Sequence, residues 1–301
     1  MPLHPKTPPP SKTVRVAGPL PGLWLEIDLE NGTDLSIPLD FSSEDPNLYG
    51  VPHAMKEAWE SNGIIGDTRK GGSCNVDTLH LTPHCQGTHT ECIGHLSNER
   101  IFIINVAPKG LLNAQLVTIQ PEAMTAAGES SRPTLDPEHV GITKRVLSQS
   151  LSMPVHPTSH FHGTSGSGYP WAKALIIRTV PNDPEKTSAT YSDNSAPFFS
   201  IEAIQYLIQL GIEHILVDLP SLDRLSDNGE MAAHRTWWDI EAGSHSSKKG
   251  PASRRTISEL LFIPDSIPDG LGLLSIQIPP FRSDAAPSRP IYFQGKLTVT
   301  S

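Results

Sequence analysis

Short apolar segments recur along the chain, and runs of glycine, proline and polar residues separate them. Segments of this length, rich in branched side chains and bounded by turn residues, are typical of β-strands. The strands that this pattern predicts cover residues 23–29, 35–41, 101–106, 116–119, 174–177, 215–219, 272–279 and 290–300. The segment 215–219 is apolar apart from Asp218 near its end, a composition typical of a buried strand.

The clearest helix begins after Ser200, because serine is a favoured N-cap residue and Gly211 is a typical residue just beyond a helix. Apolar residues recur between them at the spacing of one helix face, at Ile201, Ile204, Leu207 and Ile208. Further helices are expected over residues 137–151 and 256–261. A helix over 201–210 followed at once by a buried strand predicts an α/β fold, with helices flanking a central mixed β-sheet.

The composition indicates one folded domain. Its 301 residues, 37% hydrophobic and 18% charged, can bury a substantial core. We therefore expect a single domain over residues 21–301 after a flexible, proline-rich tail over residues 1–20. A net charge of −9 without a cluster of basic residues argues against nucleic acid as a partner. No stretch approaches the roughly 20 apolar residues of a membrane span, and three cysteines, of which two lie in the candidate site, favour a reduced, cytoplasmic setting.

The segment 84–95, with sequence HCQGTHTECIGH, holds the densest set of metal-capable side chains. Four of them fall on odd positions, so an extended backbone would direct them to one face: Cys85, His89, Glu91 and His95. Four strand residues span about 13 Å, so a single metal ion could bind both Cys85 and His89 only if the chain bends between them. Gly87 is placed to allow that bend. A lone His-x-Glu is more often a hydrogen-bonded pair in a core, but the added ligands favour a metal site.

This segment resembles the signature of the metal-dependent cyclase and bacterial kynurenine formamidase family, His-x-Gly-Thr-His-x-Asp-x-Pro-x-His. Residues 87–89 and His95 match it in place, whereas Glu91 replaces the aspartate and Ile93 the proline. The first histidine of the signature falls on Cys85 rather than His84. A thiolate ligand favours zinc, with manganese as the alternative, and makes the chain an atypical member of the family.

The resemblance extends to Asp218–Asp223, which looks like a strand-end Asp-x-x-Ser-x-Asp segment, and to two later ligands, His234 and Glu259. It implies a swivelling β/β/α fold, a homodimer and a hydrolase of an N-formyl or cyclic amide, such as an arylformamidase in tryptophan catabolism. Cys85, His89, Glu91, His234 and Glu259 would bind one or two divalent ions, zinc by preference. His95 would carry the proton in catalysis.

The residues leave other interpretations open. Trp237 and Trp238 follow His234 and are equally compatible with walls of an aromatic substrate pocket and with core packing. His89, Glu91 and His234 also make the two-histidine, one-carboxylate set of non-haem iron oxygenases. A metal-binding homologue without activity is a third possibility. Other candidates carry less weight: Asp218 and Asp223 can orient ligands or cap backbone groups, and His160 with His162 is more typical of a solvated loop.

Overall fold

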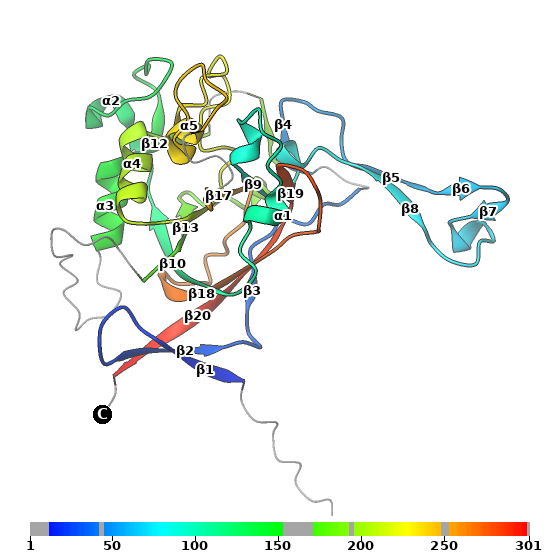
Figure 1. The fold of residues 1–301 in the computed structure, drawn as a ribbon, viewed down its shortest axis with the longest axis horizontal. Coiled ribbons are helices and arrows are strands. Elements are labelled where there is room, and N and C mark those ends of the chain that lie inside the picture. Colours follow the sequence, from blue (N-terminus) through cyan, green and yellow to red (C-terminus); the bar gives the residue numbers. More distant parts are fainter. Residues whose placement is uncertain (1–11, 42–44, 153–170, 193–195, 248–252, 300–301) are drawn as a thin grey trace, which may run out of the picture.

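The structure, a computed structural model, describes residues 12–41, 45–152, 171–192, 196–247 and 253–299. Its centre is a mixed eleven-stranded sheet (Figure 1). In spatial order the strands are β1 (Thr13–Ala17), β2 (Leu23–Asp28), β20 (Arg289–Val299), β18 (Gly270–Gln277), β10 (Leu112–Ile119), β13 (Ala174–Thr179), β16 (His214–Val217), β17 (Thr256–Glu259), β9 (His89–Cys92) and β19 (Ala285–Pro287), with β3 (Thr33–Asp34) beside β20. The expected α/β fold with a central mixed sheet is confirmed.

The middle of the sheet is parallel, from β10 through β13 and β16 to β17, whereas the strands on either side are antiparallel. These central strands are buried on both faces, which explains their nearly continuous apolar sequences. In β13, Leu175 and Ile177 pack into the core cluster on the helical face, whereas Ala174 and Ile176 pack into the cluster on the opposite face. Alternate side chains of one strand therefore hold two layers together.

The helices are short, and the three longer ones lie together on one side of the sheet (Figure 1). They are α3 (Lys144–Ser152), α4 (Ile201–Gln209) and α5 (Ala232–Trp238), with α1 (Ile103–Val106) and α2 (Met124–Ala127) as single turns. The predicted helix after Ser200 is confirmed, since the Ser200 hydroxyl accepts a hydrogen bond from the Ala203 amide. None of the helices in the described part of the chain is long and apolar enough to cross a membrane.

Several expected elements differ from the observed ones because tertiary pairing overrides local propensity. The local sequence predicts a helix over 256–261, but β17 is a strand because it pairs with both β16 and β9. A strand is expected over 101–106, but the Ile103 amide donates to the Ser283 carbonyl and starts the turn α1. Only the second half of 137–151 is helical, because β12 (Val140–Ile142) pairs with β11 (Glu122–Ala123) and β15 (Phe198–Phe199).

Two further predictions, of a strand over 35–41 and of a tail over 1–20, also differ from the observed structure. Within 35–41 the only pairing is a bridge between Ser36 and Leu261, so this segment is not a strand. The predicted flexible tail extends to residue 20, but Thr13–Ala17 is strand β1 and pairs with β2. Val14 and Val16 of this strand pack on the apolar cluster around Leu25 and Ile27. In the sequence, the many prolines on the N-terminal side make this alternation hard to recognise. Residues 1–11 and the loop 156–170, which includes His160 and His162, lie outside the described residues.

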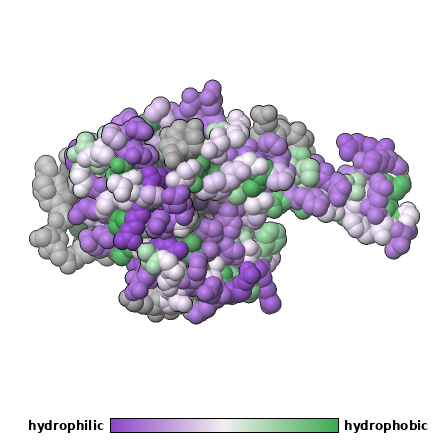
Figure 2. Space-filling model, turned by 90° about the horizontal axis from the view of Figure 1, so that it is seen from above, coloured by the Kyte–Doolittle hydropathy of each residue, from purple (hydrophilic) through white to green (hydrophobic). Residues whose placement is uncertain are grey.

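A two-stranded arm projects from the body of the molecule. It contains β5 (Met55–Ala58), which pairs with β8 (Asp77–His80), and the small hairpin of β6 (Glu60–Ser61) and β7 (Ile64–Ile65) at its tip. Figure 1 shows the arm extending beyond the remaining strands, and Figure 2 shows it standing clear of the body from a second direction. Six large apolar side chains of the arm are exposed: Met55, Trp59, Ile64, Ile65, Val76 and Leu79.

Candidate metal centre

Strand β9 carries the centre of the site, because it lies between β17 and β19 near one edge of the sheet. The antiparallel register sets His89 opposite Glu259. The chain enters β9 from a short 3-10 turn, η2 (Pro83–Cys85), and Gly87 has a φ of +61° between the two elements, so it supplies the predicted bend. The Thr88 hydroxyl then accepts a hydrogen bond from the Ile37 amide and donates to the Leu260 carbonyl, which fixes β9 against the end of β17.

Three buried side chains from three different elements form an inner group: Glu91 of β9, His234 of α5 and Glu259 of β17. One possible ligand atom from each lies within 4.8 Å of the others. The His234 Nε2 atom lies 3.0 Å from a Glu91 oxygen and 3.6 Å from a Glu259 oxygen. The fourth side chain of this region is His89, whose Nε2 lies 3.4 Å from the other Glu259 oxygen.

The hydrogen bonds behind these imidazoles orient them as metal ligands. Asp223 accepts a hydrogen bond from His234 Nδ1 at 2.7 Å and also caps the Ala233 and His234 amides at the start of α5. The Gly87 carbonyl accepts one from His89 Nδ1 at 3.2 Å. The Nε2 atoms of both rings point toward carboxylates: that of His234 toward Glu91 and Glu259, and that of His89 toward Glu259. The buried His89 Nε2 has no hydrogen-bond partner among the described residues, as expected of a ligand nitrogen.

Glu91 and His234 of the inner group shift each other's pKa. Burial alone raises the pKa of Glu91, but the nearby imidazoles of His95 and His234 outweigh it and bring this pKa well below its usual range. Burial alone lowers the pKa of His234, but the Glu91 carboxylate and the other acidic partners raise it well above its usual value. Glu91 thus stays ionised although it is buried, and a buried carboxylate needs positive charge beside it, which protonated imidazoles or a bound cation supply.

A second set of side chains, the outer group, lies on the more exposed side of Glu91: His84, His95 and Glu91 itself, with Asp284 in contact. The His84 Nε2 atom lies 3.5 Å from a Glu91 oxygen and 2.9 Å from an Asp284 oxygen. The His84 and His95 rings stack with centroids 4.3 Å apart. Contacts with these two imidazoles, opposed in part by burial, hold the pKa of Asp284 below its usual range.

Cys85 belongs to neither group. Its thiol is buried in an apolar cluster with Leu48, Leu225 and Leu260. Burial and, to a lesser extent, the Glu259 carboxylate raise the pKa of Cys85. Cys85 is therefore not among the side chains within mutual ligand distance, although the Glu259 carboxylate lies close enough to affect its pKa, whereas His84 lies 3.5 Å from Glu91.

The two tryptophans are part of the core rather than walls of an open pocket. Trp237 and Trp238 are both fully buried among the apolar residues between the helices and the sheet. The Trp238 indole donates to the Arg255 carbonyl, and its ring lies 5.6 Å from the His234 ring. Trp238 thus packs beside His234, and neither side chain offers an exposed surface to a substrate.

Sequence reasoning missed Asp284 and set His84 aside. Asp284 lies in the turn before β19, and only the pairing of β19 with β9 brings it to His95. The one local signal is an acidic residue just before a short apolar segment, which is too common to identify a site. Of the two aspartates that were candidates for orienting ligands, Asp223 does so, whereas Asp218 pairs with Lys186 at 2.8 Å and with Thr179.

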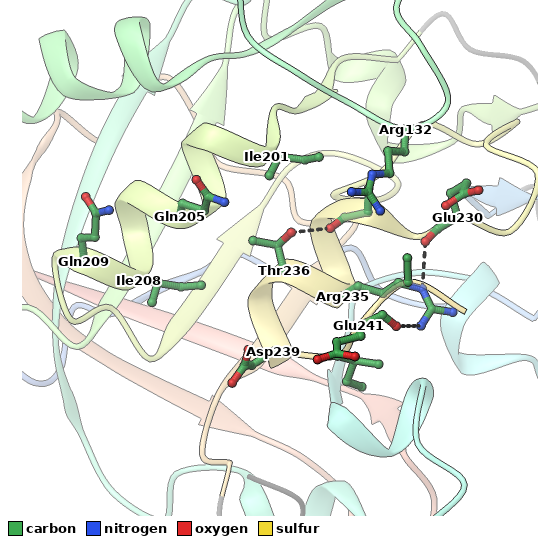
Figure 3. A pocket seen from close by; sticks show the side chains of 13 residues that line it. Arg132, Ile201, Gln205, Ile208, Gln209, Glu230, Arg235, Thr236, Asp239 and Glu241 are labelled. Atoms are coloured by element: carbon green, nitrogen blue, oxygen red, sulfur yellow. Dashed lines mark hydrogen bonds between the residues drawn. The ribbon is translucent and has the colours of Figure 1, made fainter. Parts of the chain in front are cut away.

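A surface pocket of about 690 Å³ lies between α4 and α5 (Figure 3). Arg235, Thr236 and Asp239 line it from α5, whereas His234 and Trp238 point from that helix into the core. The Arg235 guanidinium is held by the carbonyls of Glu230, Glu241 and Ser244. None of the candidate ligands lines this pocket, so it is separate from the metal centre.

Comparison with solved structures finds several that have a similar fold. An isatin hydrolase bound to the product analogue thioisatinate superposes with a TM-score of 0.54 at 14% identity, over 88% of this chain and 93% of that one. Isatin hydrolase A from Ralstonia solanacearum gives 0.51 at 15%, over 87% and 91%. A potential metal-dependent hydrolase with cyclase activity gives 0.51 at 15%, over 87% and 97%. At these identities the likeness concerns the fold.

A search of curated protein sequences gives no match. The family model described as "Putative cyclase", in contrast, matches residues 33–224, which include the segment 84–95, both strands β10 and β13, and Asp223. This match covers more than half of the chain, and it agrees with the resemblance drawn from the signature around His89. The chain belongs to the putative cyclase family.

Proposed function

We propose that the protein is a metal-dependent hydrolase that cleaves the C–N bond of an amide, either an N-formyl amide on an aromatic scaffold or a cyclic amide. The observation that carries the proposal is the inner group, in which His234 Nε2 faces two buried carboxylates and the neighbouring His89 Nε2 has no hydrogen-bond partner among the described residues. This arrangement fits one divalent cation held by Glu91, His234 and Glu259, with His89 adjacent. We propose zinc as that ion, with manganese as the alternative.

A divalent cation bound there would lower the pKa of a bound water toward about 7 and polarise the substrate carbonyl. The chain itself contributes orientation and proton transfer. Asp223 holds the His234 ring, and the Gly87 carbonyl holds the His89 ring. His95 is partly exposed at the mouth of the site, and its Nδ1 faces an Asp284 oxygen at 3.4 Å. Its Nε2 is therefore the nitrogen free to accept the water proton and return it to the leaving nitrogen.

An oxygenase is the weaker alternative. That chemistry uses two histidines and one carboxylate around iron. The three side chains that lie within mutual ligand distance here are one histidine and two carboxylates. The set therefore differs from the one that this chemistry uses, and the oxygenase reading gives His95 no role.

The test combines metal analysis with a substrate screen. Purified protein loaded with zinc or manganese is assayed against aryl formamides, isatin, cyclic imides and lactones, and hydrolysis of at least one amide is expected. Glu259→Gln should lose metal and activity together, whereas His95→Gln should keep the metal and lose at least about 100-fold in kcat. Exposed His80 on the arm gives the matched control His80→Gln, which should change neither. Iron with oxygen uptake, or bound metal without hydrolysis of any compound, would refute the proposal.

A further inference from the structure

Arg224 is a buried cation that has no anion beside it. Only 6% of this residue is exposed, and its Nε atom is buried without a hydrogen-bond partner in the described part of the chain. There its guanidinium contacts one polar side chain, the imidazole of His139, and no carboxylate. Buried charges are normally paired, because a charge loses its hydration on burial. An unpaired buried guanidinium therefore indicates an anion that comes from outside the chain.

The free edge of this guanidinium has the shape of an oxyanion site. The Arg224 Nη1 atom lies 3.4 Å and 3.5 Å from the two ring nitrogens of His139, beyond the usual length of a hydrogen bond. Its Nε and Nη2 atoms donate in parallel from the other edge. Nη2 also lacks an acceptor among the described residues and, unlike Nε, is not fully buried, so a ligand can reach it.

Arg69 shows within the same chain what such an edge binds. Its Nε and Nη2 atoms donate to the two oxygens of Asp67, at 3.0 Å and 2.9 Å. This paired geometry is the usual one between a guanidinium and a carboxylate. Arg224 presents the same two donors, but no carboxylate of the described residues fills them.

His139 adds a further donor beside Arg224. The Asp136 amide donates to His139 Nδ1 at 2.9 Å, so the proton of the neutral ring is on Nε2. Nε2 then cannot accept a hydrogen bond from the guanidinium, and it needs an acceptor itself. The ring is buried and packs edge-on against Phe198, with centroids 5.6 Å apart, which holds it in place. Two basic side chains thus gather several donors and no acceptor.

We propose that Arg224 and His139 bind an oxyanion, the carboxylate or phosphate group of a ligand. Such a group matches the two parallel donors with two oxygens and supplies the negative charge that the buried guanidinium lacks. The oxyanion belongs either to a substrate that carries a carboxylate or to a free anion. The substrate as source rests on the proposed function, whereas the binding itself does not.

A short loop connects this site to the metal centre. Asp223, next to Arg224, accepts a hydrogen bond from His234 Nδ1 at 2.7 Å. Between them the loop passes through Met231, whose φ of +48° is uncommon for a residue other than glycine. Asp227 holds this conformation by accepting a hydrogen bond from the Met231 amide at 2.6 Å. A free anion on Arg224 can therefore act on catalysis through the loop that positions His234.

Binding is measured by calorimetric titration of the purified full chain with sodium phosphate and with sodium acetate, in an amine buffer at constant ionic strength. The wild type should bind one equivalent of anion, and Arg224→Gln should weaken this binding at least about tenfold. Arg224→Lys keeps the charge but not the parallel donors, so it should retain only part of the affinity. Arg69→Gln is the matched control and should bind like the wild type, since Asp67 already fills its donors.

Two further variants separate the site from the metal centre and from a structural role. Glu259→Gln should keep the anion, because the metal centre does not hold it. Arg224→Met removes an unpaired buried charge, so without anion it should unfold at the same temperature as the wild type or higher. Phosphate should stabilise the wild type and not Arg224→Met. No binding by the wild type, equal affinity in Arg224→Gln, or loss of binding in Glu259→Gln would overturn the proposal.

Kinetics identify the source of the oxyanion. An aryl formamide that carries a carboxylate is compared with the same compound without it. If the substrate is the source, Arg224→Gln should raise KM about tenfold for the first compound only. If a free anion is the source, phosphate should change the rate of the second compound in the wild type but not in Arg224→Gln. If neither compound is hydrolysed by any preparation, the formamidase activity fails, while calorimetry still decides whether the anion site exists.

Discussion

Two neighbouring side chains, His84 and Cys85, have opposite surroundings. Successive residues of a 3-10 turn point about 120° apart. In η2 this directs the Cys85 thiol into the apolar cluster with Leu260 and the His84 ring toward Glu91 and Asp284. The spacing of the family signature assigns the first ligand position to Cys85, because it assumes that the backbone has the same conformation here as in the family. In the folded chain the preceding residue, His84, is the one that faces Glu91.

Burial of another histidine predicts a pH-dependent stability. His214 begins β16, is almost completely buried, and hydrogen-bonds through Nδ1 to the Thr256 hydroxyl. Burial lowers the pKa of His214 to about 4, against about 6.5 in an unfolded chain. Between these values the unfolded chain binds more protons than the folded one, so stability is full above pH about 6.5 and is lost as the pH falls toward 4.

The loss should reach about 3 kcal/mol, at roughly 1.4 kcal/mol for each unit of pKa shift. Urea unfolding at several pH values measures it. His214→Gln should be less stable at pH 7.5 but should show a flatter decline between pH 6.5 and 4. The exposed control His80→Gln should follow the wild type, and an equally steep decline in His214→Gln would remove His214 as the cause.

At the scale of elements, the site depends on the turn that joins η2 to β9. Gly87 has a φ of +61°, and a Cβ atom at this position would lie 3.0 Å from the Leu39 side chain. Gly87→Ala should therefore cost about 1–2 kcal/mol of unfolding free energy. It should also displace His89 and weaken zinc binding, because the Gly87 carbonyl holds that ring.

Gly128 offers a matched control, because its φ is +67° and open space surrounds its Cα. Gly128→Ala should lose a similar amount of stability to backbone strain and leave zinc affinity unchanged. Chemical denaturation and zinc titration of both variants separate strain from ligand positioning. Equal zinc affinity in the two variants would mean that the bend at Gly87 does not position His89.

We expect the predicted homodimer to form through the arm that projects from the molecule. A hairpin of two strands is only marginally stable alone, and the arm of residues 55–80 exposes six large apolar side chains. We expect a second copy of the chain to cover this surface. Light scattering coupled to size-exclusion chromatography should give twice the monomer mass of 32.6 kDa.

Ile64→Lys combined with Leu79→Lys should shift the protein toward the monomer, since both positions are about half exposed on the arm. Val299, an exposed apolar residue at the end of β20, provides the control Val299→Lys, which should stay dimeric. A monomeric wild type at micromolar concentration, or a double variant that remains dimeric, would contradict a role of the arm in assembly.

The sequence by itself determined the elements whose signals are local. The continuous apolar runs of β13 and β16 and the capped helix α4 followed from periodicity and end residues. The segment around His89 and Glu91 indicated a metal site, because histidine, cysteine and carboxylate side chains seldom gather so densely within twelve residues unless they bind a metal. His234 and Glu259 were found only through the family resemblance, since nothing local distinguishes them.

Tertiary structure alone decided what depends on contacts between distant segments. Strand β17 exists because β16 and β9 flank it, although its local sequence suggested a helix. Asp284 reaches His95 only because β19 pairs with β9, and His84 faces Glu91 only through the turn that directs Cys85 into the core. Residue types determine which chemistry is available, but a ligand set is a set of distances, and long-range packing determines those distances.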